Sequence, residues 1–147
     1  TGVGVDISAA ALGVARINAV ALDVSGRAEM VEGGWDVQLG DAFDMVVSNP
    51  PYIPEVEMAG LAREVVNHDP HLALTPGGDG LGPYRTILAR IGDVLAPGGW
   101  IGFEFGLGQA LAVSDLMGQA GLEQVEVMRD LAGIERAAFG RRPAEIP

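Results

Sequence analysis

The sequence has 147 residues, no cysteine and a formal net charge of −11 at pH 7. Its 48% hydrophobic and 20% charged residues are typical of one globular domain with its own core, which excludes a disordered chain. The lack of cysteine excludes disulfides and thiolate metal sites, and the acidic charge makes direct binding of DNA or RNA unexpected, because such a surface repels phosphate backbones.

No apolar run reaches the length of a membrane span, and the first residues lack the basic start of a signal peptide. We therefore expect a soluble, cytoplasmic protein that does not contact membranes. The 22 glycines and 9 prolines follow no fixed period, so they mark turns between elements and not a repeat.

The chain begins with a predicted strand at residues 3–7, followed by Ser8 as a helix N-cap and an apolar helix at residues 9–20. Such a helix suits close packing on the sheet of an α/β protein. Asp6 falls at the carboxyl end of the strand, where open α/β sheets bind ligands. It could accept both hydroxyls of a ribose, or it could merely help Ser8 to cap the helix.

A second predicted strand, residues 28–32, ends in two glycines and Trp35. A lone tryptophan is usually part of a core, but this one follows a strand that would neighbour Asp6, where it could cover a flat base such as adenine. The apolar run 43–47 predicts a third strand that ends just before Asn49. Parallel strands would then bring Asp6, Trp35 and Asn49 to one edge of one sheet, the expected place for a nucleotide-like cofactor and its reaction partner.

The stretch Asn49, Pro50, Pro51 and Tyr52, hereafter the 49–52 loop, carries the chemistry. Its prolines remove two backbone donors and fix φ, which leaves a stiff loop with free carbonyl groups. Tyr52 could stack on a planar group. The loop is therefore either an acceptor-rich pocket for a flat NH₂-bearing group or an ordinary proline turn.

The remaining segments predict the closing part of an α/β sheet. Helices are expected at residues 58–66, 83–95 and 109–120, and strands at 100–105, 125–128 and 137–139. The last two strands are joined by too short a link for a parallel crossover, so they should be antiparallel. The predicted fold is thus α/β, with a mostly parallel Rossmann-like sheet and an antiparallel C-terminal edge hairpin.

Other polar residues give weaker indications. The chain from Ile53 to Gly82 is largely irregular, as lids and binding loops often are. Within it, the glycine-rich stretch from Thr75 to Gly82 suits a flexible hinge but lacks the lysine of a phosphate-binding loop. His68 and His71 are better explained as exposed turn residues than as metal ligands, so no metal is expected. Glu104, inside a strand, is either a paired structural carboxylate or part of the site.

The order strand, Asp6, helix, strand, 49–52 loop and closing hairpin resembles the class I S-adenosylmethionine-dependent methyltransferases. Within them the chain is similar to the HemK-type protein-glutamine N5-methyltransferases, and this resemblance covers nearly the whole chain. The motifs that carry it are Val5-Asp6-Ile7-Ser8, Val47 to Pro54, Gly78-Asp79-Gly80-Leu81, Phe103-Glu104-Phe105-Gly106 and Asp130-Leu131-Ala132-Gly133-Ile134-Glu135-Arg136.

The resemblance implies methyl transfer from S-adenosylmethionine, with S-adenosylhomocysteine as product, to the Gly-Gly-Gln glutamine of peptide chain release factors. It implies that Asp6 binds the ribose hydroxyls, that Trp35 lies beside the adenine and that Asn49 lies near the methionine part of the cofactor. Residues 49–52 would hold the substrate amide. The family usually has an acid where this chain has Gly34. It also has a first strand, a glycine-rich cofactor loop and a helical N-terminal domain before Thr1, so residues 1–147 are expected to be a partial catalytic domain.

Two other functions fit parts of the pattern. An adenine-N6 or other amino-group methyltransferase acting on nucleic acid would use the same pocket chemistry, although the acidic charge disfavours it. A noncatalytic fragment or interaction module would need no cofactor at all. Transfer of labelled methyl groups to DNA and calorimetry with S-adenosylmethionine distinguish these alternatives from the glutamine methyltransferase.

Overall fold

The structure is a computed structural model that describes residues 1–40 and 42–144. The chain divides into two compact units, Thr1–Gln38 and Leu39–Pro147, and each is described by itself. Among the described residues the strands pair in two sheets, one of two strands and one of four, and not in the one sheet that the sequence predicted.

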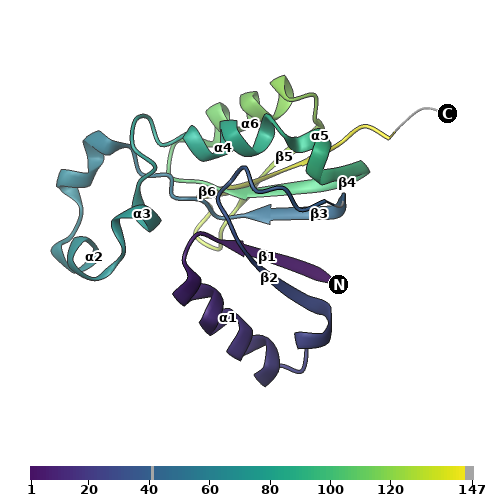
Figure 1. Cartoon of the computed structure of the whole chain (residues 1–147). Coiled ribbons are helices and arrows are strands. Elements are labelled where there is room, and N and C mark those ends of the chain that lie inside the picture. Colours follow the sequence, from purple (N-terminus) through teal and green to yellow (C-terminus); the bar gives the residue numbers. More distant parts are fainter. Residues whose placement is uncertain (41, 145–147) are drawn as a thin grey trace. The chain divides into compact units, whose positions relative to one another are not determined.

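The first unit is a strand–helix–strand arrangement whose two strands are parallel (Figure 1). Its register pairs Gly2 with Ala28 and Asp6 with Glu32, so both strands end at the same level. Helix α1 begins where the sequence predicted, because the Ser8 hydroxyl accepts a hydrogen bond from the Ala11 N–H at 3.2 Å. The elements are β1 (Gly2–Asp6), α1 (Ala9–Ala21), η1 (Ser25–Arg27) and β2 (Ala28–Glu32).

The second unit contains a four-stranded sheet in the order β3-β4-β6-β5. Strand β3 is parallel to β4, whereas β6 is antiparallel to both β4 and β5. The predicted antiparallel closing hairpin is therefore confirmed. The strands are β3 (Phe43–Ser48), β4 (Leu95–Glu104), β5 (Glu123–Arg129) and β6 (Glu135–Arg141).

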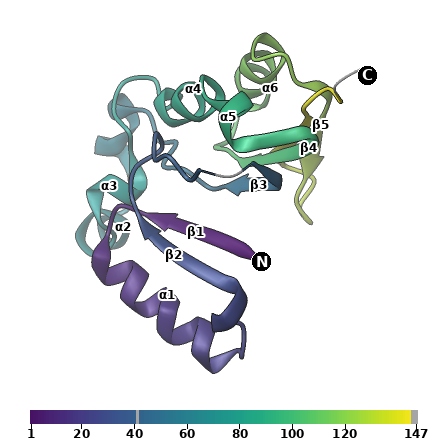
Figure 2. The same ribbon diagram turned by 45° about the vertical axis from the view of Figure 1, so that its right-hand side comes forward.

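One face of this sheet is covered by helices α4 (Gly82–Leu88), α5 (Ile91–Val94) and α6 (Ala110–Gln119), as Figure 2 shows. Alternate residues of β4 point to that face, because side chains along a strand alternate with a period of two. Ile101 and Phe103 are accordingly buried among residues of the helices. The core of the unit lies between the sheet and this helical layer.

The segment between β3 and α4 differs from the sequence prediction of one helix at residues 58–66. It forms η2 (Glu55–Gly60), α2 (Arg63–His68) and α3 (His71–Leu74). Leu61 and Ala62 adopt extended backbone angles that interrupt the expected helix. None of the helices in the described part of the chain is long and apolar enough to cross a membrane.

The predicted helix at residues 83–95 is likewise two short helices, α4 and α5. Strand β4 begins at Leu95 and not at Trp100, because Leu95 pairs with Phe43 of β3. Between this pairing and the pairing of Met45 with Trp100 the register shifts, so the Pro-Gly-Gly stretch is an irregular part of the strand. Backbone pairing with a distant strand decides this boundary.

Tyr84 links the helical layer to the end of β4. Its ring is fully buried edge-on against Phe103, with ring centroids 5.2 Å apart, and its hydroxyl donates to the Glu104 carbonyl at 2.8 Å. Burial raises the pKa of the Tyr84 hydroxyl well above its usual value, with smaller contributions from Tyr52 and Glu104. Tyr84 therefore stays a neutral donor at physiological pH.

Tyr84→Phe is expected to lower the free energy of unfolding by about 1 kcal/mol, because it removes one buried hydrogen bond without changing the shape of the ring. Urea unfolding measures the effect. Thr86→Val removes an exposed hydroxyl from the same helix and serves as control. Equal unfolding midpoints for the two variants would contradict the structural role of the Tyr84 hydroxyl.

Candidate active site

Asn49 directly follows β3, at the carboxyl end of the parallel pair β3-β4. Its side chain is exposed and takes part in no hydrogen bond within residues 1–40 and 42–144. The next residue, Pro50, is fully buried, and its carbonyl oxygen likewise accepts no hydrogen bond there. A buried proline thus anchors the loop while two acceptors beside it remain available to a ligand.

The other end of the 49–52 loop is held tightly. The Tyr52 carbonyl accepts a hydrogen bond from the Gln109 side-chain amide at 2.9 Å. The Tyr52 ring is half-buried against the core and against the Gly106 backbone, where an added Cβ would lie 2.9 Å from the ring. Only part of the ring is therefore open to a substrate. The sequence had predicted free carbonyl groups throughout the loop, but the Tyr52 carbonyl is already bonded to Gln109.

The chain after Tyr52 is tied to the segment before α4. The Ile53 N–H donates to the Leu74 carbonyl, and the Glu55 N–H donates to the Gly78 carbonyl, each at 3.1 Å. Within that segment Asp79 forms a two-pronged ion pair with Arg85, whose shorter N–O distance is 2.6 Å. The glycine-rich stretch that could have been a mobile hinge is thus cross-linked to the residues that follow the 49–52 loop.

The Arg85 guanidinium, together with the Leu81 N–H, lowers the pKa of Asp79 to about 2. Because the folded pKa lies below the unfolded value, the pair stabilises the fold above pH about 4, and this contribution disappears as the pH falls toward 2. Asp79→Asn should therefore flatten the loss of stability between these pH values, as measured by thermal unfolding. Asp115→Asn, an exposed change on α6, is the control, and identical acid profiles for the two variants would contradict the role of the pair.

The first unit brings two of the sequence-predicted residues to one end of its sheet. Asp6 is the last residue of β1, and one of its carboxylate oxygens accepts the Ser8 N–H at 2.8 Å. The other oxygen has no partner among the described residues. Asp6 therefore does help to start α1, and it keeps one charged acceptor for a ligand.

Trp35 follows β2 in a turn closed by the Val37 N–H and the Gly34 carbonyl at 3.2 Å. Its side chain is 45% exposed, so it is not the core residue that a lone tryptophan most often is. The Gly33 N–H donates to the Asp6 carbonyl, which fixes the start of this turn against the end of β1. The structure thus places Asp6 and the turn that carries Trp35 at the same end of the two-stranded sheet, and it places the 49–52 loop in the second unit.

Two residues of this region were not found from the sequence, and the role of a third was not. Tyr84 and Gln109, together with Gly80 of the Gly78-Asp79-Gly80-Leu81 motif, contact the 49–52 loop or the strand end beside it from positions far away along the chain. A helical tyrosine and a glutamine after Gly-Leu-Gly give no signal of such contacts. Glu104 is exposed, and its backbone carbonyl, not its carboxylate, accepts the Tyr84 bond.

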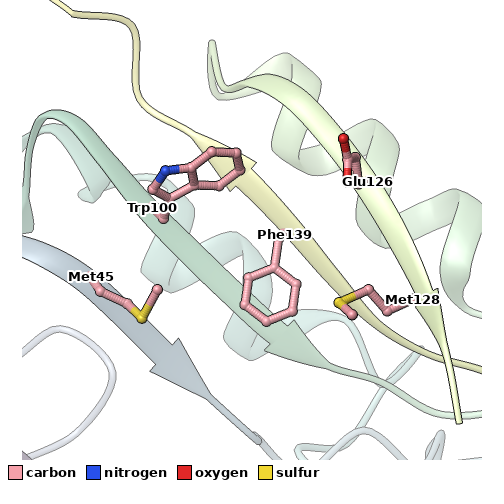
Figure 3. A pocket seen from close by; sticks show the side chains of 5 residues that line it. All are labelled: Met45, Trp100, Glu126, Met128 and Phe139. Atoms are coloured by element: carbon pink, nitrogen blue, oxygen red, sulfur yellow. The ribbon is translucent and has the colours of Figure 1, made fainter.

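A hollow also lies on the sheet face opposite the helical layer, and it contains none of the predicted site residues. Figure 3 shows its side chains on the near face of β3, β4, β6 and β5, with the helices behind. The Arg141 guanidinium lies 5.9 Å from the centre of the Trp100 ring. The lining is apolar except for one carboxylate, and it consists of Met45, Trp100, Glu126, Met128 and Phe139.

Comparison with known proteins assigns the chain to a protein family. The family model of the methyltransferase small domain matches residues 2–81, which include β1, β2 and the whole 49–52 loop. The chain belongs to the methyltransferase small domain family. The Rossmann-like α/β methyltransferase fold predicted from the sequence is thereby confirmed for this family member.

Two bacterial relatives match nearly the whole chain. The release factor glutamine methyltransferase of Rhodospirillum rubrum is 44% identical over 99% of this chain and 45% of its own length. The relative of the same name from Cereibacter sphaeroides is 46% identical over 97% of this chain and 51% of its own length. The chain therefore spans about half the length of these relatives.

One solved structure agrees with these relatives. It is the protein-(glutamine-N5) methyltransferase, release factor-specific, of Alicyclobacillus acidocaldarius. It superposes with a TM-score of 0.53 and 25% identity, covering 97% of this chain and 79% of the solved one. The similarity extends over nearly the whole of this chain.

Proposed function

We propose that this chain is the partial catalytic domain, residues 1–147, of a release-factor glutamine methyltransferase. The enzyme transfers a methyl group from S-adenosylmethionine to the side-chain amide nitrogen of the glutamine in the Gly-Gly-Gln motif of peptide chain release factors, and S-adenosylhomocysteine is the second product. The observation that carries the proposal is the 44% identity, over 99% of the chain, to a relative of that name.

The end of the first unit fits the nucleoside part of the cofactor. Asp6 keeps a charged oxygen that can accept ribose hydroxyls, and Trp35 exposes an aromatic face suited to adenine. When bound, S-adenosylmethionine supplies a methyl group on a positively charged sulfur, which is the electrophile of the reaction. The chain supplies binding and orientation.

The 49–52 loop fits the substrate amide. The nitrogen of a glutamine amide is a weak nucleophile, because its lone pair is delocalised into the carbonyl. The Asn49 side-chain oxygen and the Pro50 carbonyl each accept a hydrogen bond from one N–H of the substrate amide. These two bonds orient the nitrogen lone pair toward the methyl group and stabilise the positive charge that develops on nitrogen. As the N–C bond forms, the S–C bond of the sulfonium breaks and leaves S-adenosylhomocysteine. The methylated nitrogen is cationic and strongly acidic, so it loses one proton to solvent and no strong base is needed.

Tyr52 and Pro51 complete this pocket. The half-buried Tyr52 ring, fixed against Gly106, holds the plane of the amide, while Pro51 keeps the backbone between the acceptors and the ring rigid. The net charge of −11 supports a protein substrate over a nucleic acid.

The experiment compares acceptors for the labelled methyl group of S-adenosylmethionine, using the full-length protein. Release factor and duplex DNA are offered separately at equal protein concentration. We expect incorporation into release factor alone. Incorporation into DNA but not into release factor would replace the proposal with a nucleobase methyltransferase that uses the same loop.

A further inference from the structure

Gln109 connects the segment after β4 to the 49–52 loop. It immediately precedes α6 and lies half-buried. Its side-chain oxygen accepts the Gly106 N–H at 2.9 Å, and its side-chain nitrogen donates to the Tyr52 carbonyl at 2.9 Å. One amide thus uses both its acceptor and a donor to join the backbone at Gly106 to the backbone at Tyr52, which is 57 positions before Gln109 in the chain.

Two glycines leave room for this bridge. At Gly80, whose φ is +78°, an added Cβ would lie 2.3 Å from the Tyr52 oxygen and 3.0 Å from the Gln109 nitrogen. At Gly106 it would lie 2.9 Å from the Tyr52 ring and 3.1 Å from the Gln109 oxygen. The backbone at Gly80 and Gly106 therefore packs closely against the two hydrogen-bonded groups.

The bridge holds the end of the 49–52 loop that is not held by a strand. Asn49 leaves β3, which is fixed by its pairing with β4, and the two prolines have little freedom in φ. With both ends fixed, the loop has one arrangement. With the Tyr52 end released, rotation about ψ of the prolines moves the acceptors relative to each other.

We propose that Gln109 is a positioning residue for the substrate amide: it acts through Tyr52 and fixes the acceptors at Asn49 and Pro50. This inference rests on the proposed function and deepens it. Gln109 itself touches neither substrate nor cofactor. Because misplacing reacting groups by about 1 Å can cost as much as 10²-fold in rate, loss of the bridge should appear in turnover.

Two substitutions in the full-length enzyme separate the halves of the bridge. Gln109→Leu removes both hydrogen bonds. Gln109→Glu keeps an acceptor for the Gly106 N–H but replaces the donor to Tyr52 by a carboxylate oxygen that repels the Tyr52 carbonyl. Gln119→Leu, an exposed change at the end of the same helix, is the matched control.

Both Gln109 variants are expected to lower kcat for release factor about tenfold, which lies within the rate loss expected when reacting groups are misplaced. The Kd for S-adenosylmethionine should stay unchanged. The Glu variant should retain more thermal stability than the Leu variant and yet turn over no faster. If Gln109 only stabilised the fold, kcat of the variants would fall in the same order as their thermal stability. A kcat of the Glu variant close to that of the Gln119→Leu control would overturn the proposal.

Hydrogen exchange provides a readout that needs no substrate. The Ile53 and Glu55 N–H groups, which bond to the segment before α4, should exchange faster in both Gln109 variants, whereas the Gly106 N–H should exchange faster only in the Leu variant. Unchanged exchange at Ile53 and Glu55 would contradict the role of Gln109 in holding the Tyr52 end of the loop, even if the wild type proved inactive on release factor. Inactivity of the wild type with the expected exchange pattern would instead reject the proposed function alone.

Discussion

Asn49→Ala in the full-length protein is expected to lower kcat for release factor by about 10²–10³, the usual cost of removing one preorganised polar contact to a developing charge. The Asn49 side chain is exposed, lies at the end of β3 and has no partner within the described residues, so its removal should leave the fold intact. Single-turnover transfer of labelled methyl groups measures the effect.

Asn18→Ala is the matched control, since Asn18 is an exposed residue of α1 to which no role is assigned. It should transfer methyl groups at the wild-type rate. Thermal unfolding of both variants separates a catalytic loss from a folding loss. Turnover of Asn49→Ala within a factor of about three of the control, far less than the loss of a transition-state contact, would remove Asn49 from the mechanism.

Asp6→Asn should weaken binding of S-adenosylmethionine roughly 10- to 100-fold, because hydrogen bonds to a charged acceptor contribute about 1.5–3 kcal/mol. The asparagine oxygen can still accept the Ser8 N–H, so the start of α1 is preserved while the charged acceptor is lost. Calorimetry with the full-length protein measures the Kd. Glu29→Ala, which removes an exposed carboxylate from β2, is the control.

Asp6→Ala completes the comparison. It removes the bond to Ser8 as well, so it should lower the free energy of unfolding more than Asp6→Asn does. It should weaken binding of S-adenosylmethionine to a similar extent. Wild-type affinity in Asp6→Asn would mean that Asp6 serves only to cap the helix through its bond to Ser8.

Local chemistry explains what the sequence could predict. The run before Asn49 is β-branched and strand-length, so the position of Asn49 at a strand end followed directly, as did the cap at Ser8. The antiparallel direction of β5 and β6 followed from the short connection between them. In each case a few neighbouring residues determine the structure.

Contacts between distant segments explain what it could not predict. Leu95 belongs to β4 only because Phe43 pairs with it, and Gln109 bonds to Tyr52, which is 57 positions earlier in the chain. The apolar composition of α1 predicted close packing on a sheet, yet in the structure Leu12 and Ala19 are its buried residues, while Ile17 is 68% exposed. Composition gives the amount of apolar surface in a helix, but the elements packed on it decide which part is buried.

The position of the transferred methyl group tests the central claim most directly. Release factor is incubated with the full-length protein and S-adenosylmethionine, digested, and its peptides are sequenced by fragmentation mass spectrometry. The proposed function predicts one added methyl group on the side-chain nitrogen of the glutamine in Gly-Gly-Gln. A methyl group on any other residue, or an unmodified release factor, would contradict it.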